Sequence, residues 1–179
     1  IGLLSENWIV EAPSSPNFQQ IHDEYFLLLD RLLERGTPVD GCGMHNHFWA
    51  YDPPNPDFVA QVIQECRQRG LAAHATETTV SLNPAYHLSP KRRPQVQVDD
   101  PLMAQAKIYT EMLQVFTSTG NIFGMYGLTD RYSWVREFDQ KSGYSGPGAH
   151  IFDSDYQPKP AYHQMLEYLK SLPDKASTG

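Results

Sequence analysis

The sequence lacks several features that mark particular classes of protein. Its longest apolar runs are far shorter than the roughly 18 residues needed to cross a bilayer, which excludes a transmembrane segment and a membrane partner. Lys and Arg number 14 against 21 Asp and Glu, and the formal net charge of −7 excludes a nucleic-acid partner, which such a charge repels. The chain begins at Ile1 without a basic stretch and an apolar signal region, which indicates a processed chain or a fragment.

Cysteine is also scarce, because Cys42 and Cys66 are the only two in 179 residues. Two cysteines are too few for a disulfide scaffold, and their spacing is not that of a metal knuckle. Cys42 falls in a predicted strand and Cys66 in the helix that follows it. Helix and sheet layers are about 10 Å apart, whereas a disulfide needs its two Cα atoms within about 7 Å, so we expect two buried thiols.

Four stretches have the apolar period of a helix, and each begins with a proline at a position where its missing N–H is not needed. Apolar side chains recur at helical spacing in each stretch, so each helix is expected to bury one face. The expected helices begin at Pro16, Pro56, Pro101 and Pro160, and the first, second and fourth end at Gly36, Gly70 and Pro173. A polar tail follows over residues 174–179.

The runs between these helices are short and apolar or alternating, as is typical of strands, and cover residues 1–8, 39–48, 71–80 and 122–128. Strands that alternate with helices predict an α/β protein with a parallel sheet. A complete (β/α)8 TIM barrel needs roughly 250 residues, so we predict about four βα units, a half barrel over residues 1–173. The long connections follow the strands, which predicts an active site at that rim.

Half a barrel leaves two strand edges and one face of its sheet uncovered, and both promote aggregation. We therefore expect the chain to pair with a partner that covers them. The two possibilities are a missing N-terminal half-barrel and a second copy of the chain in a homodimer.

Two of the predicted strands end in side chains suited to acid–base chemistry. In Gly-Met-His-Asn-His, residues 43–47, alternation places His45 and His47 on one face of the strand. Glu77 ends the next strand and is a candidate nucleophile. Adjacent strands are about 4.8 Å apart, so His47 can hydrogen-bond to Glu77 and fix its orientation. The structural alternative is a pair of satisfied histidines beside a solvated glutamate.

Aromatic side chains occur at the ends of the same strands. Trp49 and Trp134 fall in predicted loops, and Tyr126 lies near the end of the fourth predicted strand. Aromatic rings near strands usually belong to a core, but rings in loops at this rim favour stacking on the apolar face of a sugar. We therefore predict substrate contacts from Tyr126, Trp134 and Trp49, together with His45.

Taken in order, these motifs resemble the C-terminal half of a glycoside hydrolase family 10 enzyme, one of the (β/α)8 xylanases. Residues 43–47 are similar to Gly-x-Gln-x-His at the end of that family's sixth strand, and Thr76-Glu77 to part of Thr-Glu-x-Asp at the end of its seventh. Residues 126–134 are similar to Trp-Gly-x-x-Asp and Ser-Trp after the family's eighth strand. Residues 152–162 are similar to the motif near the C-terminal end of the family's sequences. The resemblance covers nearly the whole chain.

The resemblance implies retaining, endo-acting hydrolysis of β-1,4-xylan or a related plant polysaccharide, with no cofactor. It implies that Glu77 is the nucleophile, that His47 orients it, and that Trp134 forms part of the wall around the bound sugar. Because polymeric plant wall does not enter cells, we expect a secreted or periplasmic protein.

The chain also departs from the family pattern. His45, Tyr126 and Thr79 stand where the family has Gln, Trp and Asp, so the substrate need not be ordinary xylan. A retaining glycosidase also needs a protonated carboxyl group to release the leaving oxygen. The family places that acid on its fourth strand, which this chain does not contain, and neither Glu6 nor Asp130 matches it. The isolated chain is therefore expected to be nearly inactive.

Two other functions stay open. His-x-His on a barrel strand near a further His and a Glu is also an arrangement for a metal-dependent hydrolase. Strand parity argues against it, because His74 is three residues from Glu77 and is expected to face the helices, so no metal site is predicted. The other possibility is a non-catalytic carbohydrate-binding relic that keeps the aromatic rim without hydrolysis.

Overall fold

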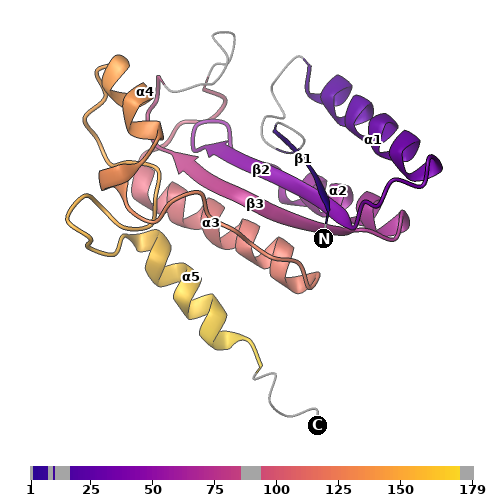
Figure 1. Ribbon diagram of the computed structural model, residues 1–179. Coiled ribbons are helices and arrows are strands. Elements are labelled where there is room, and N and C mark those ends of the chain that lie inside the picture. Colours follow the sequence, from indigo (N-terminus) through magenta and orange to yellow (C-terminus); the bar gives the residue numbers. More distant parts are fainter. Residues whose placement is uncertain (1, 8–9, 11–16, 86–93, 174–179) are drawn as a thin grey trace.

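The structure is a computed structural model that describes residues 2–7, 10, 17–85 and 94–173. The predicted helix start at Pro16 and the polar tail over 174–179 lie outside these residues. Figure 1 shows the elements in chain order: β1 (Leu3–Asn7), α1 (Phe18–Glu34), β2 (Gly41–Trp49), α2 (Pro56–Gln68), β3 (Ala72–Ser81), α3 (Pro101–Ser118), the short 3-10 helix η1 (Asp130–Tyr132), α4 (Val135–Lys141) and α5 (Pro160–Ser171).

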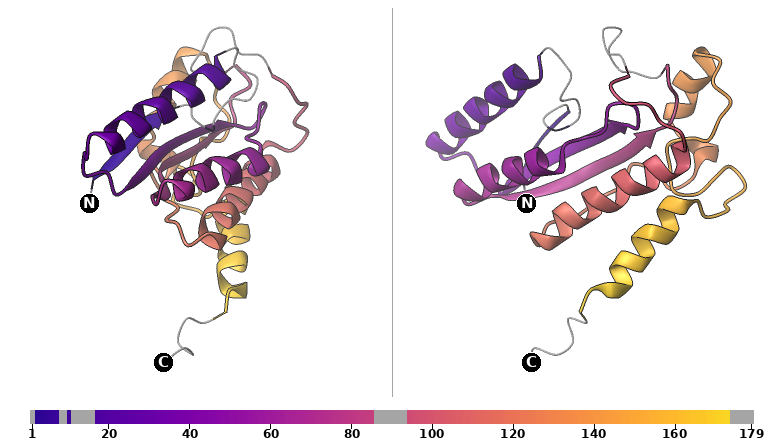
Figure 2. Two further views of the ribbon diagram at one scale, coloured as in Figure 1. Left: turned by 90° about the vertical axis from the view of Figure 1, so that its right-hand side faces the viewer. Right: turned by 180° about the vertical axis from the view of Figure 1, so that it is seen from behind.

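The three strands form one parallel sheet in the order β1-β2-β3. A helix follows each strand, which confirms the predicted alternation and the α/β class. In Figure 2, α2 and α3 lie along one side of the sheet. The fold is therefore an open part of a (β/α) barrel, and the carboxyl ends of its three strands share one rim.

The helices begin and end where local chemistry satisfies their backbone. Asn55 caps α2 by accepting hydrogen bonds from the backbone N–H groups of Asp57 and Phe58, and Asp100 caps α3 by accepting one from Met103. Proline occupies the first turn of α2, α3 and α5, as predicted. Gly70 follows α2 with a φ of 75°, a left-handed conformation that glycine adopts without strain.

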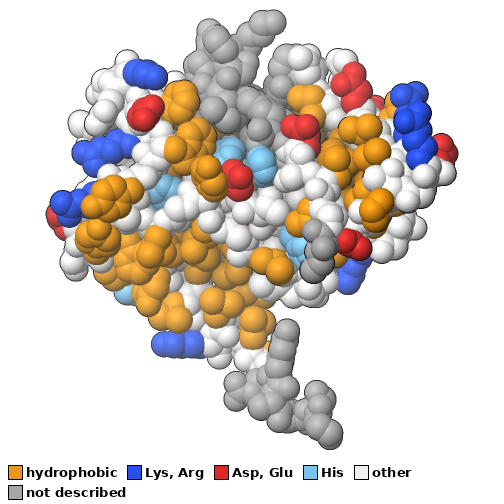
Figure 3. All heavy atoms as spheres, viewed as in Figure 1, with side chains coloured by type: hydrophobic (Ala, Val, Ile, Leu, Met, Phe, Trp, Pro, Cys, Tyr) orange, Lys and Arg blue, Asp and Glu red, His pale blue; other side chains and the backbone are white. Residues whose placement is uncertain are grey.

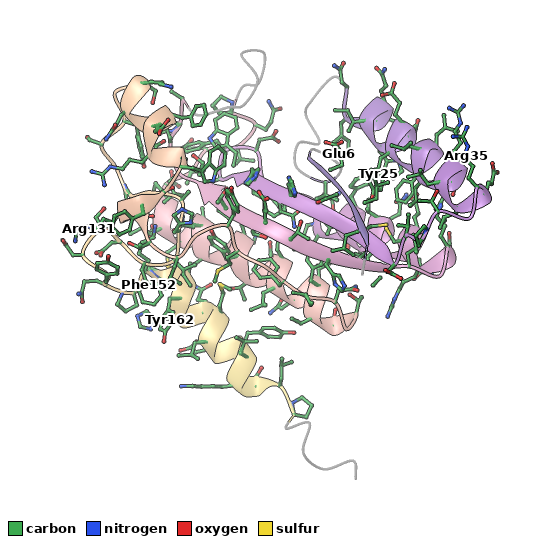
Figure 4. The ribbon with its side chains drawn as sticks, viewed as in Figure 1. Glu6, Tyr25, Arg35, Arg131, Phe152 and Tyr162 are labelled. Atoms are coloured by element: carbon green, nitrogen blue, oxygen red, sulfur yellow. The ribbon has the colours of Figure 1, made fainter. Side chains whose placement is uncertain are left out.

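The main core lies between the sheet and its helices. Cys42 and Met44 of β2 are buried there, and so are Ala73 and Ala75 of β3. Tyr25, labelled in Figure 4, ties α1 to β1 by donating a hydrogen bond of 3.0 Å to the backbone oxygen of Leu4. No helix among the described residues is both long and apolar enough to cross a membrane.

The two cysteines are free and buried, which confirms the expected pair of thiols. They are hydrogen-bonded to each other across the layer between β2 and α2. This contact lowers the pKa of Cys42 and raises the pKa of Cys66. Burial of both thiols makes them part of the core.

The prediction of a strand over residues 122–128 is wrong. This segment runs beside β3 and bonds to it irregularly, with Ala75 donating to the oxygen of Ile122 and Tyr126 donating to the oxygen of Thr78. Only one residue pair, Ala75 and Phe123, forms a strand-like bridge. Gly127 ends the extended path, because its φ of 118° belongs to the left-handed region.

Candidate active site

Two histidines and one glutamate meet near the carboxyl end of the sheet. His45 and His47 project from β2, and Glu77 projects from β3. The Nε2 atom of His45 lies 3.5 Å from one carboxylate oxygen of Glu77, and the Nε2 atom of His47 lies 3.4 Å from the other. The structure therefore brings together the predicted nucleophile and its predicted orienting histidine, and adds a second imidazole on the other side of the carboxylate.

Glu77 reaches this face because β3 contains one extra residue. Met44 pairs with Ala75, but the next residue of β2, His45, pairs with Glu77, so Thr76 is a β-bulge. Ala75 is fully buried toward the helices. With regular alternation, Glu77 would point the same way as Ala75 and would be buried in the core. The bulge instead aims its carboxylate at the two histidines.

The same bulge overturns one prediction from strand parity. His74 pairs with Gly43, which precedes His45 by two residues on the same face of β2, so His74 faces the open side of the sheet and not the helices. His74 is not part of the cluster around the Glu77 carboxylate. It lies three residues before Glu77 on β3, and its Nδ1 atom accepts a hydrogen bond of 3.0 Å from the backbone N–H of Ile122. The prediction that His74 faces the helices is therefore wrong.

His45 is held from β1 as well. The Oγ atom of Ser5 lies 2.9 Å from the Nε2 atom of His45. Gly43 makes room for this contact, because a Cβ atom there would lie only 2.6 Å from the Ser5 oxygen. Sequence reasoning missed Ser5 as a partner, although the parallel register of β1 and β2 predicts that the two side chains share a face.

His47 is buried and carries no charge at neutral pH. Burial, and to a lesser degree the neighbouring His45, lower the pKa of His47 to about 4. Its Nδ1 atom lies 3.0 Å from the hydroxyl oxygen of Thr79. When that hydroxyl donates to Nδ1, the proton of the neutral ring is on Nε2 and faces Glu77. His47 can then orient the carboxylate without neutralising it.

Two aromatic rings stand beside this cluster. The ring of Trp134 lies edge-on to His47 with centroids 4.9 Å apart, and the ring of Tyr126 lies 6.0 Å from the same histidine. Tyr126 is 47% exposed, so its ring is available to a ligand. In Figure 3 this face shows histidine side chains next to an acidic one, flanked by hydrophobic side chains. Two of the three predicted aromatic side chains, Tyr126 and Trp134, therefore lie beside the histidine that contacts Glu77.

Trp49 is placed differently from the prediction. It is the last residue of β2 rather than a loop residue, and it has no exposed surface. Its Nε1–H donates to the backbone oxygen of Asn83 at 2.8 Å, and its ring packs against Val135 and Ala149. A ring buried in this way cannot stack on a sugar, so Trp49 supports α4 and is not part of the candidate site.

Neither Asp130 nor Glu6 joins the cluster of His45, His47 and Glu77. Asp130 is buried, lies 3.1 Å from the Nζ atom of Lys159, and accepts hydrogen bonds from the backbone of Gly148 and His150. Glu6 follows Ser5 on β1, so alternation turns it away from the face that holds His45. Both carboxylates therefore lie outside the cluster of His45, His47 and Glu77.

Known proteins are similar to this chain over most of its length. Among curated proteins, endo-1,4-beta-xylanase A of Caldicellulosiruptor saccharolyticus is 28% identical over 150 residues, which are 82% of this chain and 42% of that protein. Endo-1,4-beta-xylanase B of Paenibacillus barcinonensis is 25% identical over 183 residues, covering 92% of this chain and 54% of that protein. The chain thus spans about half the length of the curated relatives it matches.

Solved structures share the fold over the same extent. Xylanase 10B from Thermotoga petrophila in complex with xylobiose has a TM-score of 0.68 and 28% identity, covering 94% of this chain and 46% of that one. Residues 15–168 match the family described as glycosyl hydrolase family 10. Because that match takes in all the elements from α1 to α4 and most of α5, the chain belongs to glycosyl hydrolase family 10.

Proposed function

We propose that this chain supplies the nucleophile half of a retaining, endo-acting enzyme that hydrolyses β-1,4-xylan or a related plant polysaccharide. The observation that carries the proposal is the Glu77 carboxylate held between two imidazoles, 3.5 Å from His45 and 3.4 Å from His47. The xylanases named above are relatives over the part of their length that includes this site.

In the proposed reaction Glu77 attacks the anomeric carbon of the bound sugar, and the bond to the leaving oxygen breaks. A covalent glycosyl-enzyme forms, and water then hydrolyses it. His47 orients the carboxylate, while His45 is placed to meet a sugar hydroxyl. Tyr126 and Trp134 supply rings that can stack on the apolar face of the sugar.

The acid that protonates the leaving oxygen is proposed to come from outside this chain. Asp130 is paired with Lys159, and Glu6 lies on the other face of β1. No strand of the described residues pairs with β1 on its outer side, whereas residues 122–126 bond to the outer edge of β3. An N-terminal half-barrel would supply both the acid and the missing strands, and a second copy of the chain is the alternative. The isolated chain is accordingly proposed to be inactive.

The polymeric substrate supports a secreted or periplasmic location. A plant polysaccharide is too large to enter a cell, so the enzyme must meet it outside the cytoplasm. The proposed unit of function is the single (β/α) half-barrel over residues 1–173 together with its partner.

The test is reducing-sugar release from xylan by the complete protein that carries both halves. Glu77→Gln keeps the size of the side chain and removes its nucleophilicity, so activity should fall on the order of 10³-fold or more. Glu111→Gln is the matched control, because Glu111 is on α3 in a surface ion pair with Lys107. Activity that is indifferent to Glu77→Gln would remove Glu77 as the nucleophile.

The same experiment separates the other functions. A carbohydrate-binding relic predicts that wild type and Glu77→Gln bind xylan equally and that neither releases sugar. A metal-dependent hydrolase predicts that a chelator abolishes activity, whereas the glycosidase proposed here should keep its activity in chelator.

A further inference from the structure

We propose that His45, His47 and Glu77 also form a binding site for a divalent transition metal such as Zn²⁺, and that bound metal inhibits hydrolysis. One candidate ligand atom from each residue lies within 4.8 Å of those from the other two. No other group of three such residues this close occurs in the part of the chain that the structure describes. The inhibition rests on the proposed function, but the binding does not.

The spacing of the ligand atoms suits a metal with bonds near 2 Å. Two ligands bound at about 2.0–2.2 Å with tetrahedral angles are about 3.3–3.6 Å apart. The distance from the imidazole Nε2 to a carboxylate oxygen of Glu77 is 3.5 Å for His45 and 3.4 Å for His47. Each histidine lies against a different carboxylate oxygen, and the three ligand atoms lie within 4.8 Å of one another, so side-chain rotations must bring them together around one ion.

The chemical types of the three ligands point to a transition metal. Two imidazoles and one carboxylate are a set that suits Zn²⁺ and its neighbours better than Mg²⁺ or Ca²⁺, which prefer oxygen. Three protein ligands leave a fourth position for water. His45 and Glu77 have 26% and 24% of their side-chain surface exposed, so an ion can enter from the open face of the sheet.

Neighbouring hydroxyl groups support the ligands. The Thr79 oxygen lies 3.0 Å from Nδ1 of His47, so this nitrogen can donate to Thr79 while Nε2 offers its lone pair to the metal. The Ser5 oxygen lies 2.9 Å from Nε2 of His45, and a metal would replace that hydrogen bond. The Ser5 hydroxyl would then be next to the ion, where it can bond to a metal-bound water.

The proposed metal site requires His45 as its third ligand. Without it only His47 and Glu77 remain, and two ligands hold Zn²⁺ weakly. A metal on Glu77 would also occupy the oxygen lone pairs that attack the sugar, so binding of metal and formation of the glycosyl-enzyme exclude each other. Inhibition by metal should therefore be competitive with substrate.

Binding is measured on the untagged 179-residue chain, freed of metal and titrated with Zn²⁺ in a calorimeter. One equivalent should bind, and His45→Gln should weaken the affinity more than about tenfold. His163→Gln is the matched control, because His163 is an exposed residue of α5. Co²⁺ gives a second readout: its spectrum should lack the sulfur charge-transfer band that binding by Cys42 or Cys66 would produce.

Absence of stoichiometric Zn²⁺ binding, or equal affinity in wild type and His45→Gln, would overturn the proposal. If circular dichroism shows that His45→Gln has lost its fold, Glu77→Gln replaces it and must weaken binding to the same degree. Inhibition is then tested in the complete protein, where Zn²⁺ should block sugar release, a chelator should restore it, and His45→Gln should be resistant. An inactive complete protein that still binds Zn²⁺ would reject the proposed hydrolysis alone.

Discussion

The orientation of the Glu77 carboxylate depends also on residues that do not contact it directly. His47 contacts it directly, and Thr79 holds His47 through a buried contact of 3.0 Å. The resemblance places an aspartate at the position of Thr79. In this chain a neutral hydroxyl therefore orients the ring of His47. A hydroxyl leaves the charge of the imidazole unaltered, which agrees with the low pKa of His47.

Replacement of Thr79 by valine should therefore damage the site without touching the substrate. Thr79→Val keeps the shape of the side chain but removes the hydroxyl that lies 3.0 Å from Nδ1 of buried His47, at a cost of about 1–3 kcal/mol in the free energy of unfolding. In the complete protein kcat should fall more than KM rises. Thr79→Ser restores the hydroxyl and should recover kcat. A loss of stability with unchanged kcat would show that Thr79 is only structural.

Tyr126 is expected to affect binding and not stability. Its ring is 47% exposed and lies 6.3 Å from the ring of Trp134. Tyr126→Ala should weaken the binding of a xylo-oligosaccharide by about 1 kcal/mol, roughly fivefold, and change the unfolding free energy by less than about 0.5 kcal/mol. Calorimetry and urea unfolding measure the two effects. Equal affinity in the two proteins would remove Tyr126 from the sugar site.

At the scale of elements, much of the architecture could be predicted from capping and periodicity. Asn55-Pro56 and Asp100-Pro101 mark the starts of α2 and α3 within a residue, because a capping side chain followed by proline leaves few alternatives. Apolar composition predicts a strand over residues 122–128, but it does not show that Gly127 adopts a positive φ.

The bulge at Thr76 could not be predicted from the sequence either. The residue types in Ala-Thr-Glu-Thr-Thr are compatible with a regular strand. They give no sign that β3 contains an extra residue. Glu77 can be predicted as a candidate nucleophile from its place at a strand end, but parity carried across the bulge puts His74 on the wrong face. Trp49 was misplaced because nothing in the sequence shows that Val135 and Ala149 cover it.

The segment after residue 128 is tied to α5 by one buried ion pair. Lys159 lies 3.1 Å from Asp130 and donates to the backbone oxygen of Gly148 at 2.8 Å. Burial lowers the pKa of Lys159, and the attraction of Asp130 opposes that shift. The pair thus joins the start of α5 to the loop that leads to Trp134.

Breaking this pair should be strongly destabilising. Lys159→Met leaves the Asp130 charge buried and unpaired, which is expected to lower the unfolding free energy by about 3–5 kcal/mol. Lys107→Met is the control, since the Lys107–Glu111 pair is on the surface at 3.8 Å and contributes about 0–1 kcal/mol. Urea unfolding at neutral pH measures both. Similar losses in the two variants would show that the buried pair has no special role.

At the scale of the whole molecule, two buried histidines link stability to pH. Burial lowers the pKa of His47 and of His150 to about 4 in each case. Neither ring nitrogen of His150 has a hydrogen-bond partner among the described residues, and its charged neighbours are Asp130, which favours protonation, and Lys159, which opposes it. The folded protein therefore keeps His150 neutral where the unfolded chain protonates it.

The sign of the effect follows from proton uptake. Between pH 6.5 and pH 4 the unfolded chain binds more protons at these positions, so stability is complete above pH 6.5 and falls as the pH drops toward 4. The loss from His150 should reach about 3 kcal/mol. His150→Leu removes the titrating group, so its unfolding free energy, measured in urea at pH 7 and pH 4.5, should fall less with acid than that of wild type. Parallel curves for the two proteins would mean that His150 has the same pKa in the folded and unfolded states, so that the Asp130 charge balances the effect of burial.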